Sequence, residues 1–291
     1  MRPTPPHAKT VLAFLAFALP VGCVGCGGSS DDSQSTTDSG ANGPGSGSLT
    51  LYSDRPIAGS TTAAVYRLEA SFTQGTTCGT TNTGGCNINP CYQSPVAFPV
   101  PDVGNVTFTG AQIATLPLEP SADGTYTTLS VQGAVAWNTG GESVMVAWAH
   151  GPGVASSPGG SMTVVSPPYM ALAPSSALAQ PASTVSRQKD LQLSWTSDSP
   201  PASADQVLVD LMIGTTQVTC AFSAAVGSGI VPAQVMQQGL AAGTGTYDIH
   251  AKEFASMPVH GPGGSSWTLS FNVDSHLRAA GGLATGAVIF E

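Results

Sequence analysis

Charged side chains are scarce in this chain, and basic ones most of all. Asp, Glu, Lys and Arg make up 9% of the 291 residues, against about 25% in ordinary soluble proteins. The formal net charge is −9 with eight Lys and Arg, and setting aside Arg2 and Lys9 near the N-terminus leaves six. Their largest cluster is the pair Arg187 and Lys189. Nucleic-acid binding needs a basic surface, so we expect no nucleic-acid partner.

The chain also lacks an apolar run long enough to cross a bilayer. The N-terminal run Val11–Gly22 holds 12 residues, whereas a transmembrane helix needs roughly 20. It follows a short segment with Arg2, His7 and Lys9 and no acidic residue. A basic start followed by a short apolar core is typical of a signal peptide, so we expect residues 1–25 to direct export and to be removed.

Two cysteines, Cys23 and Cys26, end this leader, and each is preceded by a glycine. Here the sequence resembles bacterial lipoproteins, in which the cysteine at the end of the leader is lipidated. If Cys26 is the lipidated residue, Cys23 is lost with the leader and an even set of four cysteines remains. An odd thiol is unfavourable in an oxidising compartment, so Cys26 is the preferred site and Cys23 the alternative. A plain secretory signal, cleaved nearby without lipidation, stays open as well.

No large apolar residue occurs between Gly27 and Ser48, a segment rich in Gly, Ser, Thr and Asp. Such a segment buries too little surface to offset its ordering entropy. We therefore expect residues 26–48 to form a disordered tether, which holds the domain on average about 25 Å from its anchor.

Four further cysteines define a framework in the exported part. Cys78, Cys86 and Cys91 lie in one loop rich in Gly, Asn and Thr, and Cys220 lies far along the chain with alternation that points it inward. Two disulfides are the simplest outcome in an exported chain. We expect one within the loop and one to Cys220, with the pairing left open. The cysteine spacings lack the close pairs of zinc sites, so no metal and no cofactor are expected.

Short segments with period-two alternation recur between 35 glycines and 23 prolines. Apolar residues alternate with polar ones in Tyr66–Phe72, Asp190–Trp195 and Trp267–Asp274, a pattern that predicts half-buried antiparallel strands. Further strands are expected at 49–52, 105–109, 126–132, 134–137, 143–149, 161–165, 206–213, 217–222, 246–251 and 286–290. A turn at Asn138–Gly141 should join 134–137 to 143–149. Only Pro232–Gln238 is typical of a helix.

These elements predict an all-β antiparallel sandwich with one short helix. A weak internal echo, in which His150-Gly-Pro-Gly recurs at His260, and a Pro/Ala/Ser-rich stretch at 167–186 suggest two sandwich domains, at 49–168 and 169–291. In the second half, Trp195 and the segment Gly245–Ile249 resemble the early-strand tryptophan and the tyrosine corner of immunoglobulin-like domains. The resemblance implies a fold and no chemistry.

No motif in the chain identifies a reaction. Ser186 and Lys189 have the S-x-x-K spacing of serine β-lactamases, but they lead into a strand and no K-T-G follows. His250 is expected to be a surface residue. The remaining candidates are turn histidines, His150 and His260, and acidic residues that could bind Ca²⁺ but show no ligand spacing, Asp198, Asp205, Asp210, Asp248 and Asp274. The four tryptophans are expected in the core rather than on a sugar-binding surface.

The sequence therefore favours an exported, lipid-anchored binding or structural module of the bacterial cell envelope. We expect it on the outer membrane or the cell surface, or facing the periplasm. Its partners would be the membrane, through the lipid, and an envelope protein or a glycan. The alternative is a secreted hydrolase whose site is assembled from dispersed residues, so the prediction leans away from an enzyme without excluding one.

Overall fold

The computed structural model describes residues 45–56, 63–74, 81–89, 103–121, 126–149, 159–180, 183–260, 266–280 and 282–291. All of them belong to one unit of the chain, residues 41–291. The expected leader, Cys23 and Cys26, most of the expected tether, Cys78 and Cys91 lie outside the described residues. No helix in the described part is long and apolar enough to span a membrane.

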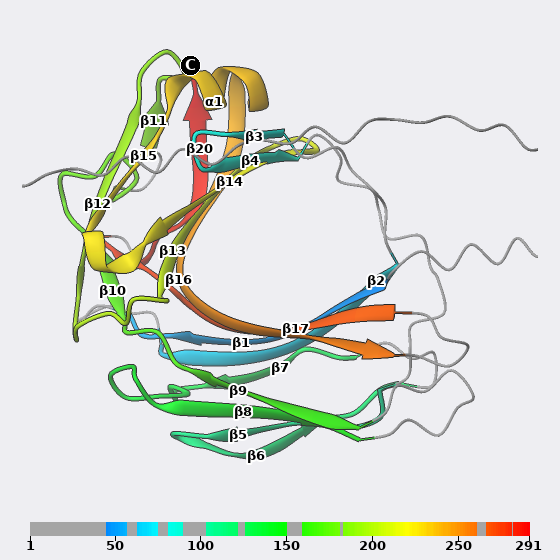
Figure 1. Cartoon of the computed structure of the whole chain (residues 1–291). Coiled ribbons are helices and arrows are strands. Elements are labelled where there is room, and N and C mark those ends of the chain that lie inside the picture. The colour runs from blue at the N-terminus through cyan, green and yellow to red at the C-terminus, as the bar shows by residue number, and fades with distance from the viewer. Residues whose placement is uncertain are drawn as a thin grey trace, which may run out of the picture. The chain divides into compact units, whose positions relative to one another are not determined.

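Strands dominate the fold, and the largest sheet contains eleven of them (Figure 1). Its central path runs in the order β3 (Thr81–Thr83), β4 (Cys86–Asn89), β14 (Thr216–Ser223), β13 (Gln206–Ile213), β16 (Gly243–His260), β17 (Ser266–His276), β1 (Gly45–Asp54), β2 (Val65–Gln74) and β7 (Leu129–Gln132). Off this path, β20 (Thr285–Phe290) pairs with β16, and β11 (Ser183–Val185) pairs with β20. Every pair on the path is antiparallel except β1 with β17, which is parallel.

Two smaller sheets are stacked on this large one. The first contains β15 (Ser228–Val231), β12 (Leu191–Ser197), β10 (Met170–Leu172), β18 (Arg278–Ala279) and β19 (Gly282–Leu283). The second contains β6 (Ile113–Leu118), β5 (Val106–Gly110), β8 (Ser143–Trp148) and β9 (Gly160–Val165). One α-helix, α1 (Ala233–Gly239), begins after Pro232, and a 3₁₀ turn covers Ala224–Val226.

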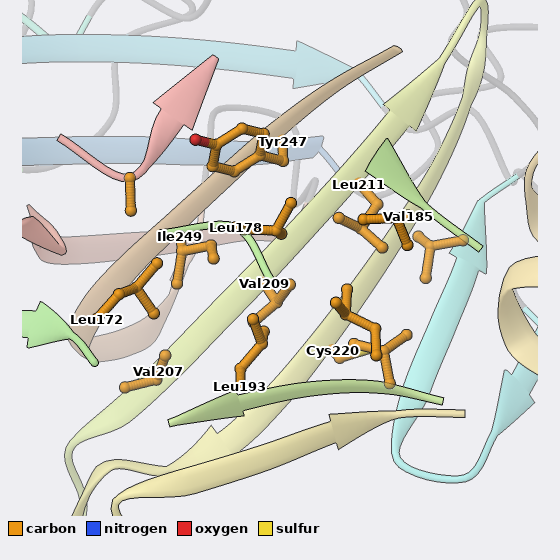
Figure 2. Close-up of a cluster of buried hydrophobic side chains, with 14 of the residues drawn as sticks. Leu172, Leu178, Val185, Leu193, Val207, Val209, Leu211, Cys220, Tyr247 and Ile249 are labelled. Carbon is orange, nitrogen blue, oxygen red and sulfur yellow. The ribbon is translucent and has the colours of Figure 1, made fainter. Parts of the chain in front are cut away.

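Each small sheet encloses a hydrophobic core against the large one. The first core lies between β13, β14 and β16 and the five-stranded sheet, and Figure 2 shows Val207, Val209 and Leu211 of β13 pointing into it. The second lies between β1, β2 and β17 and the four-stranded sheet. Strand β16 serves both, because Ile249 belongs to the first core and Met257 packs against the second. Odd-numbered residues in the first half of β16 therefore face the first core, and those in its second half face the second core.

The expected all-β architecture of stacked antiparallel sheets is confirmed, and the short helix lies within a residue of its expected position. Three of the four tryptophans, Trp137, Trp148 and Trp195, are buried as expected. The side chain of Trp267 lies outside the described residues.

The structure corrects two local expectations and adds strands that the alternation did not indicate. Residues 134–137 form no strand, so the turn at Asn138–Gly141 does not join a hairpin. Residues 45–48, expected in the tether, form the start of β1 because the sheet pairs them on both sides. The stretch 167–186 contains β10, β11 and the fully buried Leu178. The domain boundary near residue 168 stays a prediction.

Candidate functional site

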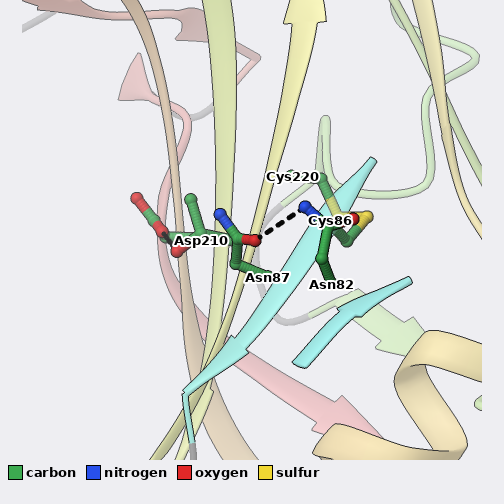
Figure 3. Close-up of a disulfide and its surroundings, with 6 residues drawn as sticks. Asn82, Cys86, Asn87, Asp210 and Cys220 are labelled. Atoms are coloured by element: carbon green, nitrogen blue, oxygen red, sulfur yellow. Dashed lines mark hydrogen bonds between the residues drawn. A yellow bond between two sulfur atoms is a disulfide. The ribbon is translucent and has the colours of Figure 1, made fainter. Parts of the chain in front are cut away.

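Within the described residues, one disulfide joins a cysteine of the loop to the distant Cys220. Cys86 on β4 lies directly opposite Cys220 on β14, and the two are bonded across 134 residues of sequence (Figure 3). Both side chains are fully buried in the first core. Beside them, Asn82 donates a hydrogen bond to Asn87 at 3.2 Å. Cys86 is thus the loop cysteine that forms the expected long closure.

The opposite side of the large sheet differs sharply from the two cores. We call it the polar face, defined by even-numbered positions on β1, β13, β16 and β17 and odd-numbered positions on β2. Strand register places these positions side by side: Tyr52 is opposite both Arg67 and Asp274, and His250 is opposite His276. Neither small sheet packs on this side, because both cores use the other.

His276 lies at the centre of the polar face, between two carboxylates. Its Nδ1 is 2.8 Å from Asp54 Oδ1, and its Nε2 is 3.2 Å from Asp248 Oδ1. The same oxygen of Asp54 also accepts the backbone N–H of His276 at 3.0 Å. One imidazole therefore connects the end of β1, the first half of β16 and the end of β17.

Burial and these carboxylates set the charge of the cluster. Burial acts to lower the pKa of His276, but Asp248 and Asp54 outweigh it and raise the pKa to about 10. Burial likewise acts to raise the pKa of Asp248, and His276 more than offsets it, so that this pKa lies below its ordinary value. At neutral pH the centre of the cluster is thus an imidazolium held by carboxylates.

A further carboxylate, Asp274, and a second histidine, His250, lie beside this centre. Asp274 is only 3% exposed, its Oδ1 makes no hydrogen bond within the described residues, and burial raises its pKa. On the neighbouring strand β16, two residues before the position opposite Asp274, His250 is 8% exposed and its Nδ1 also makes no hydrogen bond within the described residues. His250 does point away from Tyr247 and Ile249 as the alternation implies, but the expectation that it is a surface residue is wrong.

An aromatic ring covers the cluster towards β2. Tyr52 stacks on His276 with ring centroids 5.8 Å apart, and the guanidinium of Arg67 lies 4.6 Å from the Tyr52 centroid. Since β17 and β2 flank β1 on opposite sides, the Tyr52 ring lies between two cationic side chains, His276 on β17 and Arg67 on β2. Arg67 also contacts Glu69 at 3.0 Å. Burial, and then the Asp274 charge, raise the pKa of Tyr52.

Uncharged hydrogen-bonding groups continue the polar face along β1 and β17. The amide of Asn272 donates to Ser48 Oγ at 2.7 Å and to Thr50 Oγ1 at 3.4 Å. On the neighbouring strand β16, Phe254 lies opposite Asn272 and is 48% exposed. Lys252 lies opposite Asp274, with its Nζ 5.8 Å from the Phe254 centroid.

The curvature of the sheet explains how side chains on an uncovered face become buried. Figure 1 shows β16 bending along its length, with the two small sheets outside the bend. The polar face lies on the inner side, where side chains of adjacent strands crowd together. The cluster around His276 is at this bend, because β16 passes there from pairing with β13 and β20 to pairing with β17.

The geometry limits the chemistry that the cluster can perform. A histidine that acts as a general base needs one ring nitrogen free to accept a proton, and both nitrogens of His276 contact carboxylates. No group of three or more His, Cys, Asp or Glu among the described residues is placed to hold a metal ion. His276 is therefore placed to fix charges in position rather than to move protons.

The structure brings three of the five candidate acidic residues to the polar face and places the other two elsewhere. Asp248 and Asp274 belong to the cluster, and Asp210 lies opposite Asp248 on β13, where it accepts hydrogen bonds from Gln217 and Thr219. Asp198 instead pairs with Arg278, and Asp205 accepts the backbone N–H of Ala202. The side chain of His260 and all of His150 lie outside the described residues.

Sequence reasoning missed the two residues that complete the cluster, Asp54 and His276. Each ends a strand, and each continues the polar alternation of that strand. The signal available was the alternation itself, since Asn272, Asp274 and His276 follow one another at every second position. Comparison of the sequence with protein-family models and with curated proteins finds no match.

Proposed function

We propose that this chain is an exported, lipid-anchored binding module of the bacterial cell envelope, and that it binds its ligand on the polar face. The observation that carries the proposal is that the buried His276 is paired with Asp54 and Asp248 on a sheet face that neither small sheet covers. Burying charged groups is costly unless they are paired. A sheet face that only had to be exposed to solvent would not need buried, paired charges.

The position of the cluster favours binding over structural support alone. The hydrophobic cores already join the sheets on the other side. Fixed charges and hydrogen-bonding groups around a half-exposed aromatic ring are typical of a surface that recognises a ligand. The occupied nitrogens of His276 give no support to the alternative of a secreted hydrolase.

The anchor is tested by the mature N-terminus. The full chain is produced in a bacterium, and the membrane-bound product is examined by mass spectrometry. We expect a lipidated Cys26 at the N-terminus. Cys26→Ala should release the protein from the membrane fraction, and the matched variant Cys23→Ala should not. An unmodified N-terminus downstream of Cys26 would exclude the anchor.

Binding is tested separately, with the purified full chain immobilised through its C-terminus. It is exposed to fractionated envelope glycans and to envelope proteins, and retained material is identified by mass spectrometry and measured by calorimetry. We expect saturable binding that substitutions on the polar face weaken. If no glycan and no envelope protein binds, the binding function is wrong.

A further inference from the structure

From the polar face we infer that the ligand is a neutral glycan, and that one of its sugar rings stacks on Phe254. The inference rests on the proposed binding function and names the ligand class for that same face. It depends on four side chains in adjacent register positions of β16 and β17: Phe254 opposite Asn272, and Lys252 opposite Asp274.

Phe254 is the ring that a ligand can reach. Tyr52 is the other aromatic side chain of this part of the polar face, and Arg67 and His276 occupy its two flanks. Phe254 is 48% exposed and its described partner is the flexible Lys252, 5.8 Å from its centroid. An exposed aromatic ring on a polar sheet offers an apolar surface that suits the C–H face of a sugar.

The groups around Phe254 provide both donors and acceptors. Lys252 is a donor on a long, flexible stem, and Asp274 opposite it retains an oxygen without a hydrogen bond in the described part of the chain. Asn272 gives its N–H groups to Ser48 and Thr50, which leaves its carbonyl oxygen as an acceptor. The vicinal hydroxyls of a sugar both donate and accept, so they match this mixed set.

Charge balance argues for a neutral ligand. Lys252 opposes Asp274, and Arg67 pairs with Glu69 at 3.0 Å. The imidazolium of His276 neutralises one of its two carboxylates. Among its described residues, the polar face therefore has no excess of positive charge to attract a sulfated or uronic polymer, and their residual charge is negative.

Apolar composition argues against a protein as the main ligand. Protein interfaces are built around several buried aromatic or aliphatic residues. Of the exposed large apolar side chains in the described residues, Phe254 is the one on the part of the polar face formed by β1, β2, β17 and the second half of β16. Met212 and Ile289 lie at the opposite end of the large sheet, beside Thr246 and Thr244.

The test compares the full chain with Phe254→Ala, Lys252→Gln and a control, Ile230→Ala. Ile230 is an equally exposed apolar residue at 50%, on β15 in the five-stranded sheet and away from the polar face. Binding is screened on an array of neutral, uronic and sulfated oligosaccharides, and affinities for the best probe are measured by calorimetry. The thermal unfolding temperature of each variant checks that it is folded.

We expect a neutral oligosaccharide to bind, with roughly a two- to tenfold loss of affinity in Phe254→Ala, a smaller loss in Lys252→Gln and no change in Ile230→Ala. The inference is overturned if the chain prefers an anionic glycan or a protein, or if Phe254→Ala, folded, binds as tightly as the parent. In those cases the binding function stands. Absence of any ligand in the screens would remove both.

Discussion

The clearest energetic consequence of the structure is that His276 should make folding stability depend on pH above neutrality. Its pKa rises from an ordinary value of 6.5 to about 10 because Asp248 and Asp54 hold the imidazolium. A group whose pKa is raised on folding stabilises the folded state fully below its unfolded pKa and loses that contribution as the pH passes its folded pKa. With about 1.4 kcal/mol per pKa unit, the stabilisation reaches at most roughly 5 kcal/mol. It should be complete at pH 6 and lost towards pH 10.

The measurement compares the parent chain with His276→Gln, which keeps a hydrogen-bonding side chain but has no charge. Free energies of unfolding are taken from urea denaturation, followed by tryptophan fluorescence, at constant ionic strength between pH 5.5 and 10. Subtracting the two curves removes the groups common to both. Tyr52 does not add a transition there, because burial raises its pKa. We expect the difference to be largest near pH 6 and to decline steadily from about pH 6.5 until it is nearly gone at pH 10. A difference that is independent of pH, or that is already lost by about pH 7.5, would refute the reasoning.

Three further variants test the fold. Replacing Cys86 and Cys220 together by Ser should lower the free energy of unfolding by about 5 kcal/mol, since the bond closes a loop of 134 residues; equal stability of the parent before and after reduction would contradict this. Gly245→Ala should cost about 1–3 kcal/mol or prevent folding, because its Cβ would lie 2.2 Å from the Met212 carbonyl oxygen, and unchanged stability in urea would show that the strands can separate there. Tyr169→Phe should cost about 1–3 kcal/mol, because its hydroxyl donates to a buried carbonyl at 2.9 Å, and a loss below 0.5 kcal/mol in the same assay would show that the bond is not needed.

Much of the fold follows from local alternation. Strands with one apolar face, such as β12 and β13, were predictable because every second residue enters a core. The short strands β18 and β19 were not, since two residues carry no period. Residues 134–137 form a short apolar run that a buried strand could contain, yet no described strand pairs with them. A local pattern indicates that a segment is able to be a strand, while pairing decides whether it becomes one.

The site could not be located in the same way, because its parts meet only through pairing of distant segments. Asp54 and His276 are 222 residues apart in sequence and become neighbours through the parallel pairing of β1 with β17. Nothing local in either strand specifies this partner. The burial of His250 was missed for a related reason. It depends on the bend of the sheet, and alternation predicts which face a residue occupies but not how crowded that face becomes.

The same pairing leads to a test of the domain boundary expected near residue 168. The second core contains Leu269, Phe271 and Val273 of β17, which come from beyond that boundary. Burying each such side chain contributes about 1.5–3 kcal/mol, so the three together are comparable with the whole stability of a small domain, about 5–15 kcal/mol. A fragment of residues 41–168 should therefore lack cooperative unfolding in urea, while the full unit, residues 41–291, should show it. Cooperative unfolding of the fragment, with tryptophan emission like that of the intact chain, would show that residues 49–168 fold independently and that β17 adds to a core already formed.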